Sequence, residues 1–173
     1  MTLSYEHENT SRLLGRFVIV FTEELGLPIN SGGSTTFRRR KRQRGLEPDD
    51  CYWIASESLV RGKDRINLRT DPPPDLALEI DITRSSLDRL AIYAALRIPE
   101  VWRLENQVVV CYLLGADGRY AARTSSHAFP GLNPAEFSPF LALRGQMDEN
   151  AIVRQFRAWV HQQLASGGLK GNP

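Results

Sequence analysis

The acidic residues of segment 75–83 are the first in the chain whose types and spacing suggest chemistry. The segment alternates strictly between apolar residues and mostly acidic ones, which predicts a β-strand with one apolar face. Three acids would share the opposite face: Asp75, Glu79 and Asp81. Carboxylates two residues apart on one strand face lie about 7 Å from each other. Their charges repel, so the pair either holds a proton or attracts a cation.

A second acidic pair, Asp49 and Asp50, follows a proline just before the preceding apolar segment. If that segment pairs with strand 75–83, Asp49 can point at Glu79. Converging carboxylates without cysteine or clustered histidine are the donor set of Mg²⁺, which takes oxygen ligands and lowers the pKa of a bound water. The alternative is that Asp49 and Asp50 are turn residues and that Asp75 caps a proline-rich loop. Spacing alone leaves both interpretations open.

Six of the 22 basic residues are concentrated in residues 38–44, whereas the net charge of the chain is only +2. A dense basic segment in an otherwise mildly acidic chain can contact the phosphate backbone of a nucleic acid. The residues predicted to do so are Arg38, Arg39, Arg40, Lys41 and Arg42. The alternative is a solvated hairpin tip whose charge keeps a strand edge from pairing with other chains.

Helix and strand patterns place these residues on an α/β (α+β) fold. Apolar residues at helical spacing predict a first helix over residues 8–25 and a last helix over 148–164. Ser85 begins a capping-box pattern that predicts a helix stopping before Pro99. Strands are predicted over residues 29–37, 51–54, 75–83, 101–104 and 108–114. The first two would form a hairpin with the basic segment near its tip, and the whole order predicts a mixed sheet flanked by helices.

Length and composition indicate one globular domain over residues 1–165 with a flexible, glycine-rich tail over residues 166–173. The 42% of hydrophobic residues excludes a disordered chain. No window approaches the roughly 20 apolar residues of a membrane span, and the N-terminus lacks the apolar core of a signal peptide. We therefore expect a cytoplasmic protein with no membrane partner. Two cysteines, Cys51 and Cys111, are too few for a disulfide framework or a cysteine-rich metal site.

Five short motifs, spread over most of the chain, are specific in combination. They read Ser-Gly-Gly-Ser-Thr-Thr-Phe-Arg-Arg (31–39), Gly-Leu-Glu-Pro-Asp (45–49), Pro-Pro-Asp-Leu-Ala-Leu-Glu-Ile-Asp (73–81), Tyr-Ala-Ala-Leu (93–96) and Ile-Pro-Glu-Val-Trp (98–102). With this combination the chain resembles the Uma-type family of restriction endonucleases, within the PD-(D/E)-x-K nuclease superfamily. The resemblance implies a restriction-endonuclease-like core, a mixed sheet flanked by helices.

The resemblance also assigns residues to the superfamily's site. Its Pro-Asp acid corresponds to Asp49 and its strand acid to Glu79, while the position of its lysine holds Asp81 here. Members of the family often place a lysine on the following helix instead, and the matching residue is Arg89. Arginine stays protonated and cannot act as a base, although it can bind a phosphate bidentately. His7 is a cleft residue if the chain follows its relatives, and otherwise a surface residue.

The prediction is a Mg²⁺- or Mn²⁺-dependent endonuclease that hydrolyses phosphodiester bonds in DNA. Asp49, Glu79 and Asp81 would bind the metal, and Arg89 would stabilise the transition-state phosphate. The alternative, which the missing lysine favours, is a catalytically inactive nuclease-fold module that binds nucleic acid or a protein partner. A homodimer is expected because a two-fold arrangement suits duplex DNA.

Overall fold

One mixed β-sheet forms the centre of the described chain, which in this computed structural model comprises residues 4–36, 47–80 and 89–169. The strands are β1 (Asn30–Ser31), β2 (Asp50–Trp53), β3 (Leu76–Ile80), β4 (Glu100–Glu105), β5 (Val108–Leu114) and β6 (Tyr120–Arg123). They lie in sequence order, and every neighbouring pair is antiparallel apart from β3 and β4, which are parallel. Parallel neighbours need a crossover, and helix α3 (Arg89–Leu96) lies in that connection.

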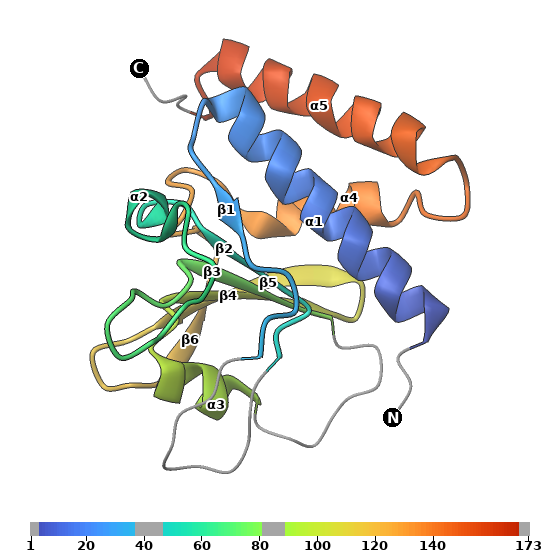
Figure 1. The fold of residues 1–173 in the computed structure, drawn as a ribbon. Helices are drawn as coiled ribbons and strands as arrows, with labels where there is room; N and C mark the ends of the chain where they lie inside the picture. Colours follow the sequence, from blue (N-terminus) through green and yellow to red (C-terminus); the bar gives the residue numbers. More distant parts are fainter. Residues whose placement is uncertain (1–3, 37–46, 81–88, 170–173) are drawn as a thin grey trace.

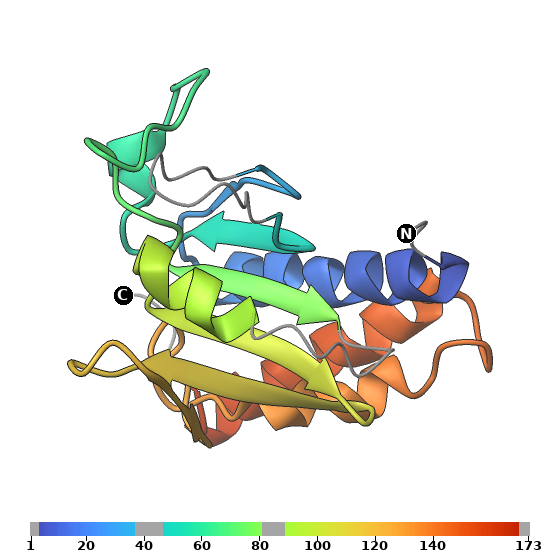
Figure 2. The same ribbon diagram turned by 90° about the horizontal axis from the view of Figure 1, so that it is seen from below.

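Helices cover both faces of the sheet. On one face, α1 (Tyr5–Leu25) and α5 (Glu149–Ser166) lie side by side (Figure 1). The 3-10 turn η1 (Pro134–Phe137) and α4 (Ser138–Leu141) pack on the same side. Helix α3 lies over the opposite face (Figure 2), and the short α2 (Glu57–Val60) follows β2. The predicted mixed sheet flanked by helices is therefore confirmed.

Helix α1 begins and ends at residues that satisfy its terminal backbone groups. Ser4 accepts a hydrogen bond from the His7 amide at 3.2 Å through its side-chain oxygen. Gly26 ends the helix with a φ of +66°, which suits glycine because it has no Cβ. The helix predicted over 8–25 is confirmed and starts three residues earlier, at Tyr5. The added turn contains His7, which is therefore a buried helix residue.

Strand β3 is buried on both faces by side chains of two separate clusters. Its leucines and isoleucine pack against α1 in the main core, while Ala77 packs with Tyr93 of α3 in a smaller one. The alternation predicted for segment 75–83 is confirmed over β3. Its acidic face, however, is covered by α3, so Glu79 is a buried carboxylate with 3% of its surface exposed.

The first predicted strand is much shorter than residues 29–37. β1 has two residues, and the chain turns at Gly33, which has a φ of +56°. Gly32 passes so close to β2 that a Cβ there would lie 2.6 Å from the Cys51 sulfur. β1 still pairs antiparallel with β2, as the predicted hairpin requires. The basic segment 38–44 lies outside the described residues.

Helix α5 extends two residues beyond the predicted end at residue 164, and one residue after it is buried. Ser166 is the last residue of the helix, and Gly167 ends it with a φ of +76°. Leu169 is buried in the main core. Residues 166–168 are exposed, so Leu169 is the one described residue beyond the helix that reaches the core. The flexible tail over residues 166–173 stays a prediction, and residues 170–173 lie outside the described residues.

Glu100, the first residue of β4, is a buried carboxylate that anchors the segment following β6. One oxygen, Oε2, accepts hydrogen bonds from the backbone amides of His127 and Ala128, both at 2.8 Å. The other, Oε1, accepts from Trp102 Nε1 at 2.5 Å and from Ser126 Oγ at 2.7 Å. Two apolar side chains directly after these contacts, Phe129 and Leu132, are buried in the main core. Glu100 therefore has a structural role.

Candidate active site

Antiparallel pairing of β2 with β3 brings the Pro-Asp acid beside the strand acid. Asp50 lies opposite Leu78, so the same register continued by one residue places Asp49 opposite Glu79. The Asp49 carboxylate is fixed there, because its Oδ2 accepts a hydrogen bond of 2.6 Å from the amide of Ile80. The predicted pairing of the two strands is confirmed. The two acids therefore lie side by side at one end of the sheet.

Both oxygens of the Glu79 carboxylate have partners on helix α3. Oε1 accepts a hydrogen bond and forms an ion pair with Arg89, and Oε2 accepts a hydrogen bond of 2.6 Å from the Tyr93 hydroxyl. Arg89 and Tyr93 are four residues apart and so lie on the same side of the helix. The residue that the family resemblance matched to a helix lysine therefore reaches the strand acid.

Helix α1 contributes His7 to the same site. Its Nε2 lies 3.3 Å from Asp49 Oδ2, and the whole residue is 9% exposed. Its Nδ1 is buried and has no hydrogen-bond partner among the described residues; the Glu8 carboxylate is 3.6 Å away. From sequence, His7 is interpreted either as a cleft residue or as a surface residue. Its burial and its contact with Asp49 favour the cleft residue. The sequence signal was weak because one histidine at a helix start has no spacing to another ligand.

Burial sets the electrostatics of the two acids. It raises the pKa of Asp49, against the hydrogen bond from Ile80 and the charges of His7 and Arg89. Burial also raises the pKa of Glu79, and the neighbouring Asp49 charge adds to this effect against the contacts with Tyr93 and Arg89. Two adjacent carboxylates that both resist ionisation form a place where a divalent cation would be stabilised.

We expect metal-free Asp49→Asn to be more stable than the wild type at neutral pH. A carboxyl group whose pKa rises on folding stabilises the protein below its unfolded pKa, and this contribution is lost as the pH rises through the folded-state value. Asparagine keeps an oxygen for the Ile80 amide but carries no charge. Thermal unfolding in EDTA should give the variant a higher Tm at about pH 8, with a difference that shrinks towards about pH 4.

Asp71→Asn is the control of opposite sign. The hydrogen bond from Lys63 lowers the pKa of Asp71, so this acid stabilises the folded state above its unfolded pKa and loses that contribution as the pH falls through the folded-state value. We expect Asp71→Asn to lower the Tm at about pH 8. If Asp49→Asn also lowered the Tm there, the assigned direction for Asp49 would be wrong.

The donor set of the site fits a hard divalent cation. Asp49 and Glu79 offer carboxylate oxygens, and Mg²⁺ is normally held by one or two carboxylates together with water and substrate phosphates. Within residues 4–36, 47–80 and 89–169, no three histidine, cysteine or acidic side chains converge as a metal-binding group. The third predicted ligand, Asp81, lies outside these ranges, so the described residues supply a two-carboxylate site.

Two other acids singled out by sequence have structural roles. Asp75 lies at the far end of β3, where its Oδ2 accepts hydrogen bonds from the amides of Ile54 and Ser56 at 2.7 and 3.0 Å. Asp50 accepts a hydrogen bond of 2.5 Å from the Tyr52 hydroxyl. The Asp75 contacts favour the capping interpretation for this residue. Neither contact involves Asp49 or Glu79.

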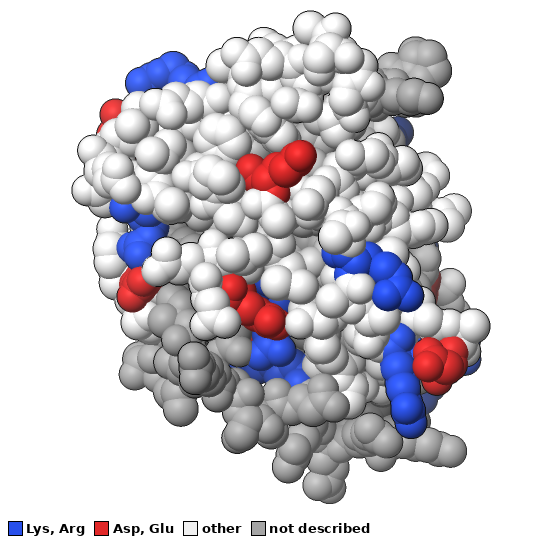
Figure 3. Space-filling model, turned by 180° about the vertical axis from the view of Figure 1, so that it is seen from behind, with Lys and Arg blue, Asp and Glu red and all other residues white. Residues whose placement is uncertain are grey.

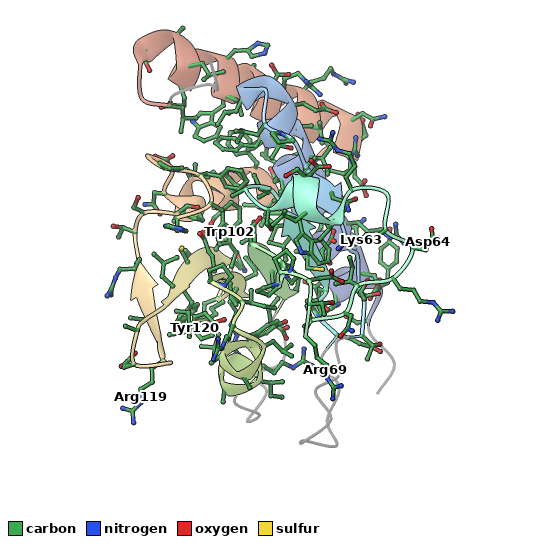
Figure 4. All side chains as sticks on the ribbon, turned by 60° about the vertical axis from the view of Figure 1, so that its left-hand side comes forward. Lys63, Asp64, Arg69, Trp102, Arg119 and Tyr120 are labelled. Carbon is green, nitrogen blue, oxygen red and sulfur yellow. The ribbon has the colours of Figure 1, made fainter. Side chains whose placement is uncertain are left out.

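Charges of both signs are mixed on one face of the molecule. Figure 3, which views the molecule from behind, shows lysine, arginine and acidic residues dispersed among uncharged ones. The basic side chains of the α2–β3 connection are partly neutralised, because Arg61 pairs with Glu57 and Lys63 with Asp71. Figure 4 shows Lys63 and Asp64 on this connection, and Arg119 extending away from the sheet. Nucleic-acid contact by the basic segment 38–44 stays a prediction.

The mixed sheet and its two helical layers define a restriction-endonuclease-like α+β fold. A family model described as Uma2, putative restriction endonuclease, matches residues 1–144. The chain therefore belongs to the Uma2 family. No curated protein matches the chain. Restriction-endonuclease-like families generally use divalent metals, in agreement with the donor set of the site. No helix in the described ranges is long and apolar enough to cross a bilayer.

Proposed function

We propose that the chain is a Mg²⁺- or Mn²⁺-dependent endonuclease that hydrolyses phosphodiester bonds in DNA. The observation that carries the proposal is the placement of Asp49 opposite Glu79, with Arg89 in contact with Glu79. Paired carboxylates, one buried and one partly buried, suit a metal with oxygen ligands, and the neighbouring guanidinium suits a phosphate. Membership of the Uma2 family supports the same reaction class.

Each residue of the site has a definite task in this proposal. When bound, the divalent cation lowers the pKa of a water and offsets charge developing on the scissile phosphate. Asp49 and Glu79 hold it. His7 Nε2 and the Ile80 amide both contact Asp49 Oδ2 and so orient this carboxylate. Arg89 binds oxygens of the phosphate and stabilises their negative charge.

The proposal extends to residues outside the described ranges. Asp81 is a third carboxylate of the site, either as a ligand or as an acceptor that holds a water of the ion. The basic segment, Arg38 to Arg42, contacts the phosphate backbone beside the site and gives salt-dependent affinity. A second copy of the chain, related by a two-fold axis, lets the protein act on both strands of duplex DNA.

One observation favours the alternative, a nuclease-fold module without turnover. Both oxygens of Glu79 are already engaged, one of them by an arginine that cannot lose its proton to act as a base. Such a site would bind nucleic acid through Arg89 and the basic segment while leaving the phosphodiester bond intact. Cleavage assays separate this function from hydrolysis.

Incubation with supercoiled, linear and single-stranded DNA tests the proposal. We expect cleavage in Mg²⁺ or Mn²⁺ that stops when EDTA removes the metal, and a loss of at least about 100-fold in Asp49→Asn. The matched control is Asp71→Asn, because the Asp71 side chain is 9% exposed and that of Asp49 is 10% exposed. If neither the wild type nor Asp49→Asn cleaved DNA, and both kept salt-dependent DNA binding, the inactive module would be supported.

A further inference from the structure

The contact between Arg89 and Glu79 places an arginine where the proposed function places a metal ion. We infer that Arg89 is an internal cation that competes with the divalent metal for Glu79 and is released by a DNA phosphate, so that metal and DNA bind cooperatively. This inference rests on the proposed function and deepens it, because it states how the site is regulated.

The two α3 partners of Glu79 differ in their freedom to move. Tyr93 is completely buried, so packing fixes its hydroxyl against Oε2. The Arg89 side chain is 36% exposed, whereas that of Glu79 is only 4% exposed, so the guanidinium reaches the carboxylate from the side of the solvent. A long, partly hydrated side chain can adopt another rotamer at low cost. Arg89 is therefore the partner that can leave.

The charges around Glu79 explain why a metal and the guanidinium exclude each other. Asp49 and Glu79 carry two negative charges when ionised, and Arg89 supplies one positive charge. His7 and Glu8 are the further titratable groups whose charges act on Asp49. A divalent cation balances the two acids alone, so a guanidinium that remained would be repelled at short range in a poorly solvated site. Arginine cannot relieve this repulsion by losing its proton, so it has to move.

A phosphate provides the place for Arg89 to go. Guanidinium groups bind phosphate through two parallel hydrogen bonds, which compensates Arg89 for the lost carboxylate. The phosphate thereby removes the competitor from Glu79, and the metal in turn frees Arg89 for the phosphate. Thermodynamic linkage requires the two effects to be equal, so DNA tightens metal binding by the same factor by which metal tightens DNA binding.

Calorimetric titration with Ca²⁺, a divalent cation with oxygen ligands, measures the competition without relying on turnover. Arg89→Met keeps the bulk of the side chain and removes its charge, and we expect it to bind Ca²⁺ at least about 5-fold more tightly than the wild type. Short duplex DNA, with its own Ca²⁺ binding subtracted, should tighten Ca²⁺ binding to the wild type at least about 5-fold more than it tightens binding to Arg89→Met, where only the phosphate ligands contribute. Arg89→Gln serves as a second uncharged variant if Arg89→Met does not fold.

Arg157→Met is the matched control, because Arg157 also pairs with a carboxylate, Glu24, and its side chain is 39% exposed. Its Ca²⁺ affinity should equal that of the wild type. Equal affinities of wild type and Arg89→Met, with Ca²⁺ binding still lost in Glu79→Gln, would overturn the inference and leave the proposed metal site intact. Ca²⁺ binding that neither Asp49→Asn nor Glu79→Gln weakens, or no Ca²⁺ binding by either the wild type or Arg89→Met, would overturn both.

Discussion

Glu79→Gln is expected to reduce DNA cleavage by about 1,000-fold or more, and the addition of Asp49→Asn is expected to reduce it little further. Glutamine preserves the size of the side chain and an oxygen for the Tyr93 hydroxyl, but it removes the charge that a metal needs. Residues that act as one unit lose their contribution together, so the double variant should resemble the worse single variant. Single-turnover cleavage with enzyme in excess over DNA measures these rates without product release.

Glu57→Gln is the matched control for this series. The Glu57 side chain is 7% exposed and pairs with Arg61, as Glu79 pairs with Arg89, but it belongs to α2. Its replacement should change cleavage by no more than about 2-fold, because such local pairs contribute little. If the double variant instead lost the product of the two single losses, Asp49 and Glu79 would act independently and would not share one ion. Folded Glu79→Gln that cuts at the wild-type rate would exclude Glu79 from the site.

The adjacency of Asp49 and Glu79 was predictable because it depends on short-range rules. Strict alternation over 75–83 identifies a strand by its period of two residues, and the proline before Asp49 marks the entry to another strand. Only one long-range assumption was needed, the pairing of these two strands, and the structure confirms it. The arginine on α3 was identified by family resemblance, because nothing in its local sequence distinguishes it from any surface arginine.

Other features of the site depend on packing that local patterns do not encode. Register decides that Asp49, and not Asp50, lies opposite Glu79, and a shift by one residue would exchange their faces. The burial of Glu79 depends on α3, which covers a strand face that the sequence pattern presents as polar. His7 reaches Asp49 only because α1 crosses the sheet with its first turn beside the end of β2 and β3. The helix pattern predicts α1 but not this crossing.

Glu100→Gln is expected to destabilise the protein by about 3 kcal/mol, although Glu100 belongs to no proposed site. In the wild type each oxygen of this buried carboxylate accepts at least two hydrogen bonds. An amide replaces one oxygen by a donor, so either the amides of His127 and Ala128 or the donors from Trp102 and Ser126 lose their acceptor. Buried donors left without an acceptor cost about 1–3 kcal/mol each. The Tm should fall by roughly 10 °C.

Glu105→Gln on the same strand separates this effect from a general loss of charge on β4. The Glu105 side chain is 29% exposed and accepts a hydrogen bond from the Tyr112 hydroxyl, which a glutamine oxygen can replace. The free energy of unfolding of Glu105→Gln, measured in urea, should differ from that of the wild type by less than about 1 kcal/mol. If Glu100→Gln unfolded at the same urea concentration as Glu105→Gln, the anchoring of residues 126–128 would not depend on the carboxylate. The packing of Phe129 and Leu132, which follow this segment and are buried in the main core, would then hold it in place without Glu100.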